Sequence, residues 1–224
     1  MKSRFARIVV FSGFLSFFIV ASDYPNETNA QQISDFDRFT LPINYCGIED
    51  PDIKDEISDD IYDLVRELPE PIERAFINDG VTINVVSSNI YKRDYALDFP
   101  TVGQYDNNRN IIINGDCEYY IETLAHEIGH YVQDEFVNED SVKYNYKRSR
   151  VKMQQTIREY TGTNADECFA DGFMLYILNP DYLKDYCYSY YSFIDSSIEQ
   201  IHGSPSIATQ GNRGLPLYRE EVSL

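Results

Sequence analysis

The chain has 224 residues, of which 43% are hydrophobic and 25% are charged, and it contains 13 Phe and 19 Tyr. This composition excludes a disordered chain and fits one domain with its own core, alone or with a small accessory segment. Its 19 Lys and Arg against 37 Asp and Glu give a formal charge of -18. Such a charge argues against a general nucleic-acid-binding protein, because the phosphate backbone requires a cationic partner.

The first residues have the pattern of an export signal. Three basic residues stand in the first seven positions, before an apolar run from Ile8 to Val20 and the small residues Ala21 and Ser22. This order predicts a signal peptide over residues 1–21, with cleavage between 21 and 30. The run is too short for a comfortable membrane span, although an uncleaved anchor is the alternative. We therefore expect a secreted protein whose mature form has no stable membrane anchor.

Export would permit disulfide bonds among the four cysteines. They are Cys46, Cys117, Cys168 and Cys187, and the sequence leaves all three full pairings open. Because no two of them lie close together in the sequence, they do not resemble a thiolate zinc site.

The first half of the chain predicts a polar arm, two helices and two strands. Residues 22–50 form the arm, since they hold few periodic apolar positions. Apolar residues at three- and four-residue steps predict an amphipathic helix from Asp52 to Leu68, followed by a short helix from Ile72 to Ile77. Alternating residues from Val81 to Val86 predict a strand. The segment from Tyr105 to Asn114 is interpreted as an edge strand and hairpin above the cleft.

The second half predicts four helices and a loose tail. The helices are expected from Tyr119 to about Glu135, Ser141 to about Tyr160, Asn164 to Leu178 and Tyr182 to about Ile201. The main domain would then span 51–202, with a flexible tail over 203–224 that is rich in Gly, Ser and Pro. This order, from helix to strands and then to further helices, is that of an α+β fold. We expect the protein to be a monomer.

A basic run from Lys143 to Lys152 stands out in this acidic chain. Such a run is most often a solvated helix face. The alternative is a surface that recruits an acidic partner or lipid headgroups.

His126-Glu-Ile-Gly-His130 is the strongest chemical signal in the chain. Side chains four residues apart share one face of a helix, so both imidazoles can bind one zinc ion. Glu127 can flank the open position of the metal and take a proton from a water molecule there, whose pKa the metal lowers. Two of the chain's three histidines fall in this motif, and a predicted strand precedes it. Both observations argue against the alternative, a chance match on an amphipathic helix.

Catalytic zinc normally takes three protein ligands and water. A third histidine six residues after the second is absent, since position 136 is Phe, and His202 is expected to be a solvated surface residue near the tail. The best remaining candidate is Glu167, in the sequence Glu167-Cys-Phe-Ala-Asp171. Asp171 lies on the same helical face, where it can orient a metal-binding histidine. The alternative is an acidic, solvated face.

The two motifs in this order resemble the anthrax lethal factor-like peptidase domain, whose members carry HExxH and a downstream E-x-F-A-[E/D] helix. The resemblance covers about Val81 to Leu178. It implies a zincin-like fold, in which a small mixed sheet with an edge strand lies over the HExxH helix and the C-terminal half is mostly helical. It also implies His126, His130 and Glu167 as ligands of one Zn²⁺ per chain. In this family a tyrosine seven residues before the zinc glutamate hydrogen-bonds the oxyanion, which corresponds to Tyr160 here.

The small secreted members of the family, which cut between two prolines, are similar to this chain in size and in having a signal peptide. Those members use a tryptophan in their specificity pocket, whereas this chain has no Trp. The resemblance therefore predicts zinc endopeptidase chemistry on an extended protein or peptide substrate and leaves Pro-Pro specificity open. The alternative function is a non-catalytic exported toxin subunit or adhesin with a structural zinc.

Overall fold

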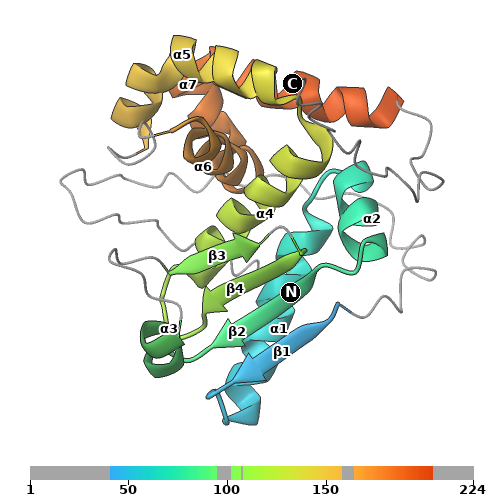
Figure 1. Cartoon of the computed structure of the whole chain (residues 1–224), viewed down its shortest axis with the longest axis vertical. Helices are drawn as coiled ribbons and strands as arrows, with labels where there is room; N and C mark the ends of the chain where they lie inside the picture. The colour runs from blue at the N-terminus through green and yellow to red at the C-terminus, as the bar shows by residue number, and fades with distance from the viewer. Residues whose placement is uncertain (1–40, 95–101, 107, 158–163, 204–224) are drawn as a thin grey trace, which may run out of the picture.

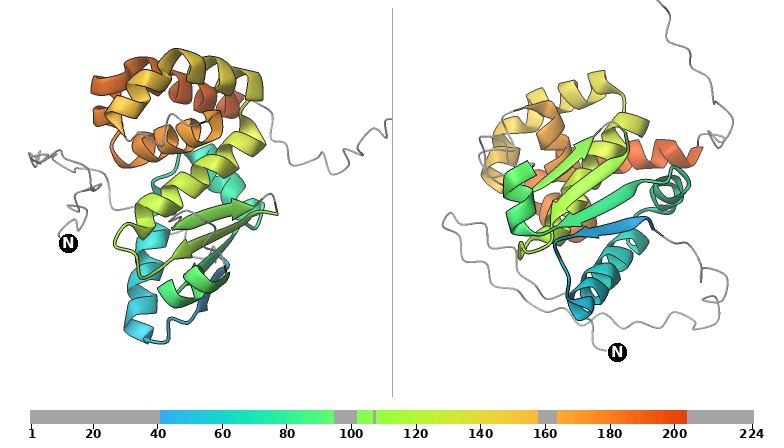
Figure 2. Two further views of the ribbon diagram at one scale, coloured as in Figure 1. Left: turned by 60° about the vertical axis from the view of Figure 1, so that its left-hand side comes forward. Right: turned by 60° about the horizontal axis from the view of Figure 1, so that its bottom comes forward.

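The computed structural model describes residues 41–94, 102–106, 108–157 and 164–203. A small sheet with helix α1 behind it lies at one end, and helices α5, α6 and α7 gather at the other (Figure 1). Helix α4 runs between these two parts (Figure 2). The signal peptide expected over 1–21 lies outside the described residues, as does the tail expected over 203–224 apart from its first residue, which ends α7.

In the described part of the chain, the sheet has four strands in the order β1-β2-β4-β3. Their bounds are β1 Ile43–Cys46, β2 Thr82–Val86, β3 Gly103–Asp106 and β4 Asn110–Asn114. The pairs β1–β2 and β2–β4 are parallel, and β3 pairs with β4 in antiparallel fashion. The expected hairpin is therefore confirmed, with β3 as the edge strand and β4 inside the sheet.

The described residues of the first half form the helices α1 (Pro51–Arg66), α2 (Glu70–Asn78) and α3 (Ser88–Asp94). Asp50 caps α1 by accepting a hydrogen bond from the Asp52 backbone N–H, which satisfies one of the unpaired donors of the first turn. The apolar face of α1 is buried with the inner faces of β2 and β4 in one hydrophobic core. Burial of this face, more than helix propensity, stabilises α1.

The second half is formed by α4 (Tyr120–Phe136), α5 (Glu139–Thr156), α6 (Ala165–Leu178) and α7 (Pro180–Gly203). Helix α6 packs between α4 and α7. Helix α7 is kinked at Cys187, where φ is -148° and ψ is 59°. Among the described residues, no helix has the length and apolar character needed to cross a membrane.

The α+β architecture expected from the sequence, with a small mixed sheet and a helical C-terminal half, is confirmed. The boundary of the arm predicted over 22–50 is wrong, because residues 43–46 form β1 and pair with β2. This strand is short and only every second residue is half-buried, so it carries little apolar signal. Helix α3 was also missing from the prediction.

The basic run predicted as a solvated face lies on α5, where Lys143, Lys147, Arg148, Arg150 and Lys152 are all exposed. The four cysteines lie in the described part of the chain, and each is a free thiol there. Cys168 and Cys187 are buried and Cys46 is exposed.

Candidate metal centre

Two helices bring three candidate ligands together. His126 and His130 lie one turn apart on α4, and Glu167 lies in the first turn of α6. One ligand atom from each of the three lies within 4.8 Å of the others. The sequence prediction that a carboxylate from another helix would join the two histidines therefore matches the geometry.

The distances between these atoms suit a zinc ion. His126 Nε2 lies 3.2 Å from Glu167 Oε2, and His130 Nε2 lies 3.7 Å from Glu167 Oε1. Ligands about 2.1 Å from a tetrahedral zinc are separated by about 3.4 Å. Two imidazoles and one carboxylate are also the donor set of catalytic zinc sites that leave one position open. The residues present therefore fit the metal.

Asp171 lies one turn after Glu167 on α6 and is fully buried. Its Oδ1 is 2.8 Å from His126 Nδ1 and accepts a hydrogen bond from it. This bond leaves His126 Nε2 facing Glu167 and fixes the orientation of the ring. A carboxylate in this position is the usual outer partner of a metal-binding histidine, as the sequence predicted for Asp171.

Close packing of the two helices makes this arrangement possible. A Cβ atom at Gly129 would lie 2.8 Å from the Ala170 Cα and 3.1 Å from its carbonyl oxygen. These are backbone atoms that cannot swing aside, so any larger residue would push α4 and α6 apart. The glycine inside HExxH, which costs helix propensity, is therefore explained by contact with α6.

The surroundings shift the pKa values of the two histidines in opposite directions. Burial alone would lower the pKa of His126, but hydrogen bonds with Asp171 and Glu167 outweigh it and raise the pKa to about 9. Burial, with repulsion from His126, lowers the pKa of His130 to about 4. Burial opposes ionisation of Glu167, yet its contacts with the two histidines hold its pKa below the usual value. In the metal-free site, a proton on His126 thus takes the place of a cation.

Glu127 is buried and follows His126 on α4. It is close enough to add to the rise in the pKa of His126. Its side chain also lies against the start of β3, since a Cβ at Gly103 would come within 2.8 Å of Glu127 Oε1. The carboxylate is therefore held near His126 and against the edge strand, where it can accept a proton beside the candidate metal centre.

Sequence reasoning did not single out Asn164, which caps α6. Its side-chain oxygen accepts a hydrogen bond of 2.8 Å from the Glu167 backbone N–H, and this fixes the turn that presents Glu167. The signal was present, because an Asn three residues before a Glu at a helix start is similar to a capping box. Tyr160 lies outside the described residues, and His202 lies in the last turn of α7.

Comparison with known proteins points to one family and one fold. The family model described as anthrax toxin lethal factor, N- and C-terminal domain, matches residues 101–197. The resemblance to the lethal factor-like family is confirmed. This match contains both motifs, from β3 to most of α7.

The fold is similar to that of the PRO-PRO endopeptidase (PPEP-2) from Paenibacillus alvei. The TM-score is 0.50 at 18% sequence identity, and the match covers 69% of this chain and 96% of that chain. A search of curated proteins finds no match. The lethal factor-like match, the zincin-like fold and the His–His–Glu group together support a metalloendopeptidase.

Proposed function

We propose that the protein is a secreted, zinc-dependent endopeptidase that hydrolyses extended protein substrates. The observation that carries this proposal is the convergence of His126, His130 and Glu167, with Glu127 buried beside them. The three ligands would hold the metal, with Asp171 orienting His126. The apolar run from Ile8 to Val20 supports export.

Bound zinc would polarise the scissile carbonyl and acidify water at its open position. Glu127 would accept the proton of that water and later deliver it to the leaving amine, acting first as base and then as acid. Tyr160 would donate a hydrogen bond to the oxyanion, as the lethal factor-like resemblance implies. A donor of this kind is commonly worth roughly 3 kcal/mol of the barrier.

The backbone of β3 is suited to pairing with an extended substrate. The Asn114 N–H bonds the Val102 carbonyl, so Gly103, one residue along and opposite Ile113, is a non-hydrogen-bonded position of the ladder. In an antiparallel pair, residues at such positions direct both backbone groups away from the partner strand. Gly103 and Tyr105 therefore present N–H and C=O groups to the outer edge, where an added strand can bind them.

The charge of -18 favours basic or neutral residues around the cleaved bond. A structural zinc in a non-catalytic toxin subunit or adhesin is the alternative. Such a site usually closes with four protein ligands, whereas three potential ligands group together in the described part of the chain.

The proposal is tested with Glu127→Ala. We expect the variant to bind zinc as the parent does but to lose peptide hydrolysis by several orders of magnitude, because the general base is missing. Metal analysis and digestion of a peptide library measure the two properties, and the library also identifies the preferred cleavage site. Glu122→Ala, five residues earlier on the same helix, is the matched control and should retain activity.

Equal turnover by Glu127→Ala would contradict the assigned role. A wild-type protein that holds zinc but cleaves no member of the library would favour the structural-zinc alternative.

A further inference from the structure

Strand β3 begins directly against the side chain of the proposed base. A Cβ atom at Gly103 would lie 2.8 Å from Glu127 Oε1 and 3.1 Å from Glu127 Cγ. It would also lie 2.3 Å from Thr123 Cγ2. Cβ atoms essentially never approach other heavy atoms within 3.0 Å in folded proteins, so a side chain at this position would force Thr123 and Glu127 to shift.

The contact belongs to an alignment of the whole strand with α4. Tyr105, two residues along and thus on the same face of β3, packs edge-to-face on Tyr131, with 6.3 Å between ring centroids. Gly103 therefore lies beside the early part of α4, and Tyr105 lies beside a later turn. The edge strand and the HExxH helix run alongside each other, and Glu127 faces the point where β3 starts.

The two clashing neighbours differ in their freedom to move. Thr123 is β-branched, buried and restricted at χ1, so a methyl group against it costs stability. Glu127 Oε1 is the free end of a longer side chain and can swing aside at small cost to folding. A methyl group at position 103 would thus lower stability mainly through its contact with Thr123. Its contact with Glu127 would mainly displace the carboxylate.

We infer that Gly103 is a positioning residue for Glu127: its missing side chain lets the carboxylate lie between the candidate metal centre at His126 and the first outward-facing backbone groups of the edge strand. This inference rests on the proposed peptidase function. It adds that the general base and the substrate-binding strand are set relative to each other by a single glycine.

The test uses Gly103→Ala and Gly103→Ala/Thr123→Ser in the full-length protein. The serine removes the Cγ2 methyl group and leaves the clash with Glu127. For the single variant we expect a lower melting temperature and a fall in kcat of about 100-fold, the size associated with a misplacement of about 1 Å. Zinc content and KM should stay near the parent values. For the double variant we expect the melting temperature to recover while kcat stays low.

Gly115→Ala is the matched control, because its Cβ would lie 2.5 Å from a Val85 methyl group, away from the candidate metal centre. It should lower the melting temperature and leave kcat near that of the parent. A loss of kcat in Gly115→Ala as large as in Gly103→Ala would show that crowding alone reduces activity, and would overturn the inference.

Three further outcomes would overturn it. Unchanged kcat in Gly103→Ala would show that Glu127 is not displaced in a way that matters. Recovery of kcat in the double variant would assign the effect to Thr123, and a rise in KM alone would assign it to substrate binding. The proposed function fails separately, through absence of zinc or of hydrolysis in the wild-type protein.

Discussion

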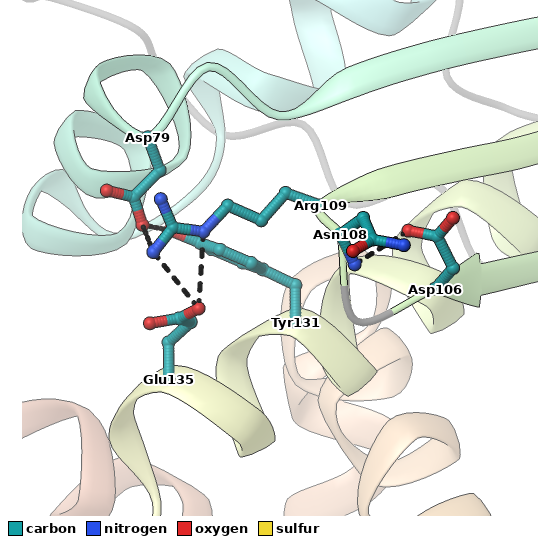
Figure 3. A network of polar contacts seen from close by, with 6 residues as sticks. All are labelled: Asp79, Asp106, Asn108, Arg109, Tyr131 and Glu135. Atoms are coloured by element: carbon teal, nitrogen blue, oxygen red, sulfur yellow. Dashed lines mark hydrogen bonds and ion pairs between the residues drawn. The ribbon is translucent and has the colours of Figure 1, made fainter. Parts of the chain in front are cut away.

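The α4–α6 helix pair and the β3–β4 hairpin meet at Glu127 but are held in place by different kinds of contact. The helix pair is joined through backbone-close packing at Gly129 and the buried bond between His126 and Asp171. The hairpin is fixed to its surroundings by partly exposed charges at its turn (Figure 3). The comparison predicts that changes in the helix pair reduce metal binding, whereas changes at the hairpin turn have only small effects on substrate alignment.

Arg109 is the centre of the contacts at the hairpin turn. It takes a positive φ of 63° between β3 and β4, and its guanidinium lies 3.3 Å from Asp79 Oδ2 and 3.2 Å from Glu135 Oε1. Tyr131 also donates to Asp79, at 2.9 Å. Figure 3 shows this group joining the end of α2, the turn and the last part of α4. The hairpin is thereby tied to the helix that carries the two histidines.

The largest effect is expected from Glu167→Gln. An amide oxygen is a weaker zinc ligand than a carboxylate, so affinity should fall by more than the about 10- to 100-fold typical of losing an outer partner, and hydrolysis should fall with it. Competition with a chelator measures the affinity. Asp166→Asn is the matched control, since that carboxylate accepts from Gln133 Nε2 at 2.6 Å. An equal loss in Asp166→Asn would mean that net charge, and not coordination, governs the binding of zinc.

A smaller loss of zinc affinity, about 10- to 100-fold, is expected from Asp171→Asn. Burial would lower the pKa of His126, but hydrogen bonds with this carboxylate and with Glu167 outweigh burial and raise the pKa from 6.5 to about 9. In the metal-free protein, protonated His126 therefore adds stability below about pH 6.5, and this is lost as pH rises through about 9. Thermal unfolding of the metal-free parent and of metal-free Asp171→Asn should be measured across this pH range. We expect the stability of the variant to depend less on pH than that of the parent. Unchanged zinc affinity in Asp171→Asn would contradict a role for Asp171 at the candidate metal centre.

The smallest effect is expected from Arg109→Gln. Partly exposed ion pairs contribute about 0–1 kcal/mol, so the melting temperature should fall slightly and KM should rise a few-fold, while zinc affinity stays that of the parent. High salt should reduce the differences in melting temperature and KM between Arg109→Gln and the parent, because salt screens the ion pairs in the parent. Arg74→Gln, which removes the exposed pair with Glu70 on α2, should leave KM unchanged. Loss of zinc in Arg109→Gln would contradict the assignment of metal binding to the α4–α6 helix pair alone.

Local patterns in the sequence predict the helical half better than the sheet. The HExxH spacing and the i, i+4 placement of Glu167 and Asp171 are properties of single helices, so they can be recognised without the fold. Strand β1 cannot be recognised from the sequence, because it is four residues long and partly exposed. The roles of Gly103 and Arg109 depend on residues about 20 or more positions away. Their contacts arise from chain topology, which no local periodicity encodes.

The burial of Cys168 has a consequence for working with the protein. Burial raises the pKa of this thiol to about 12, and the thiolate is the form that binds metals and reacts with electrophiles. The Cys168 thiol, although adjacent to Glu167 in the sequence, therefore stays protonated near neutral pH and would not compete for a bound metal ion. Cys46 is exposed, so a spectroscopic label attached there would leave the chemistry of the centre untouched.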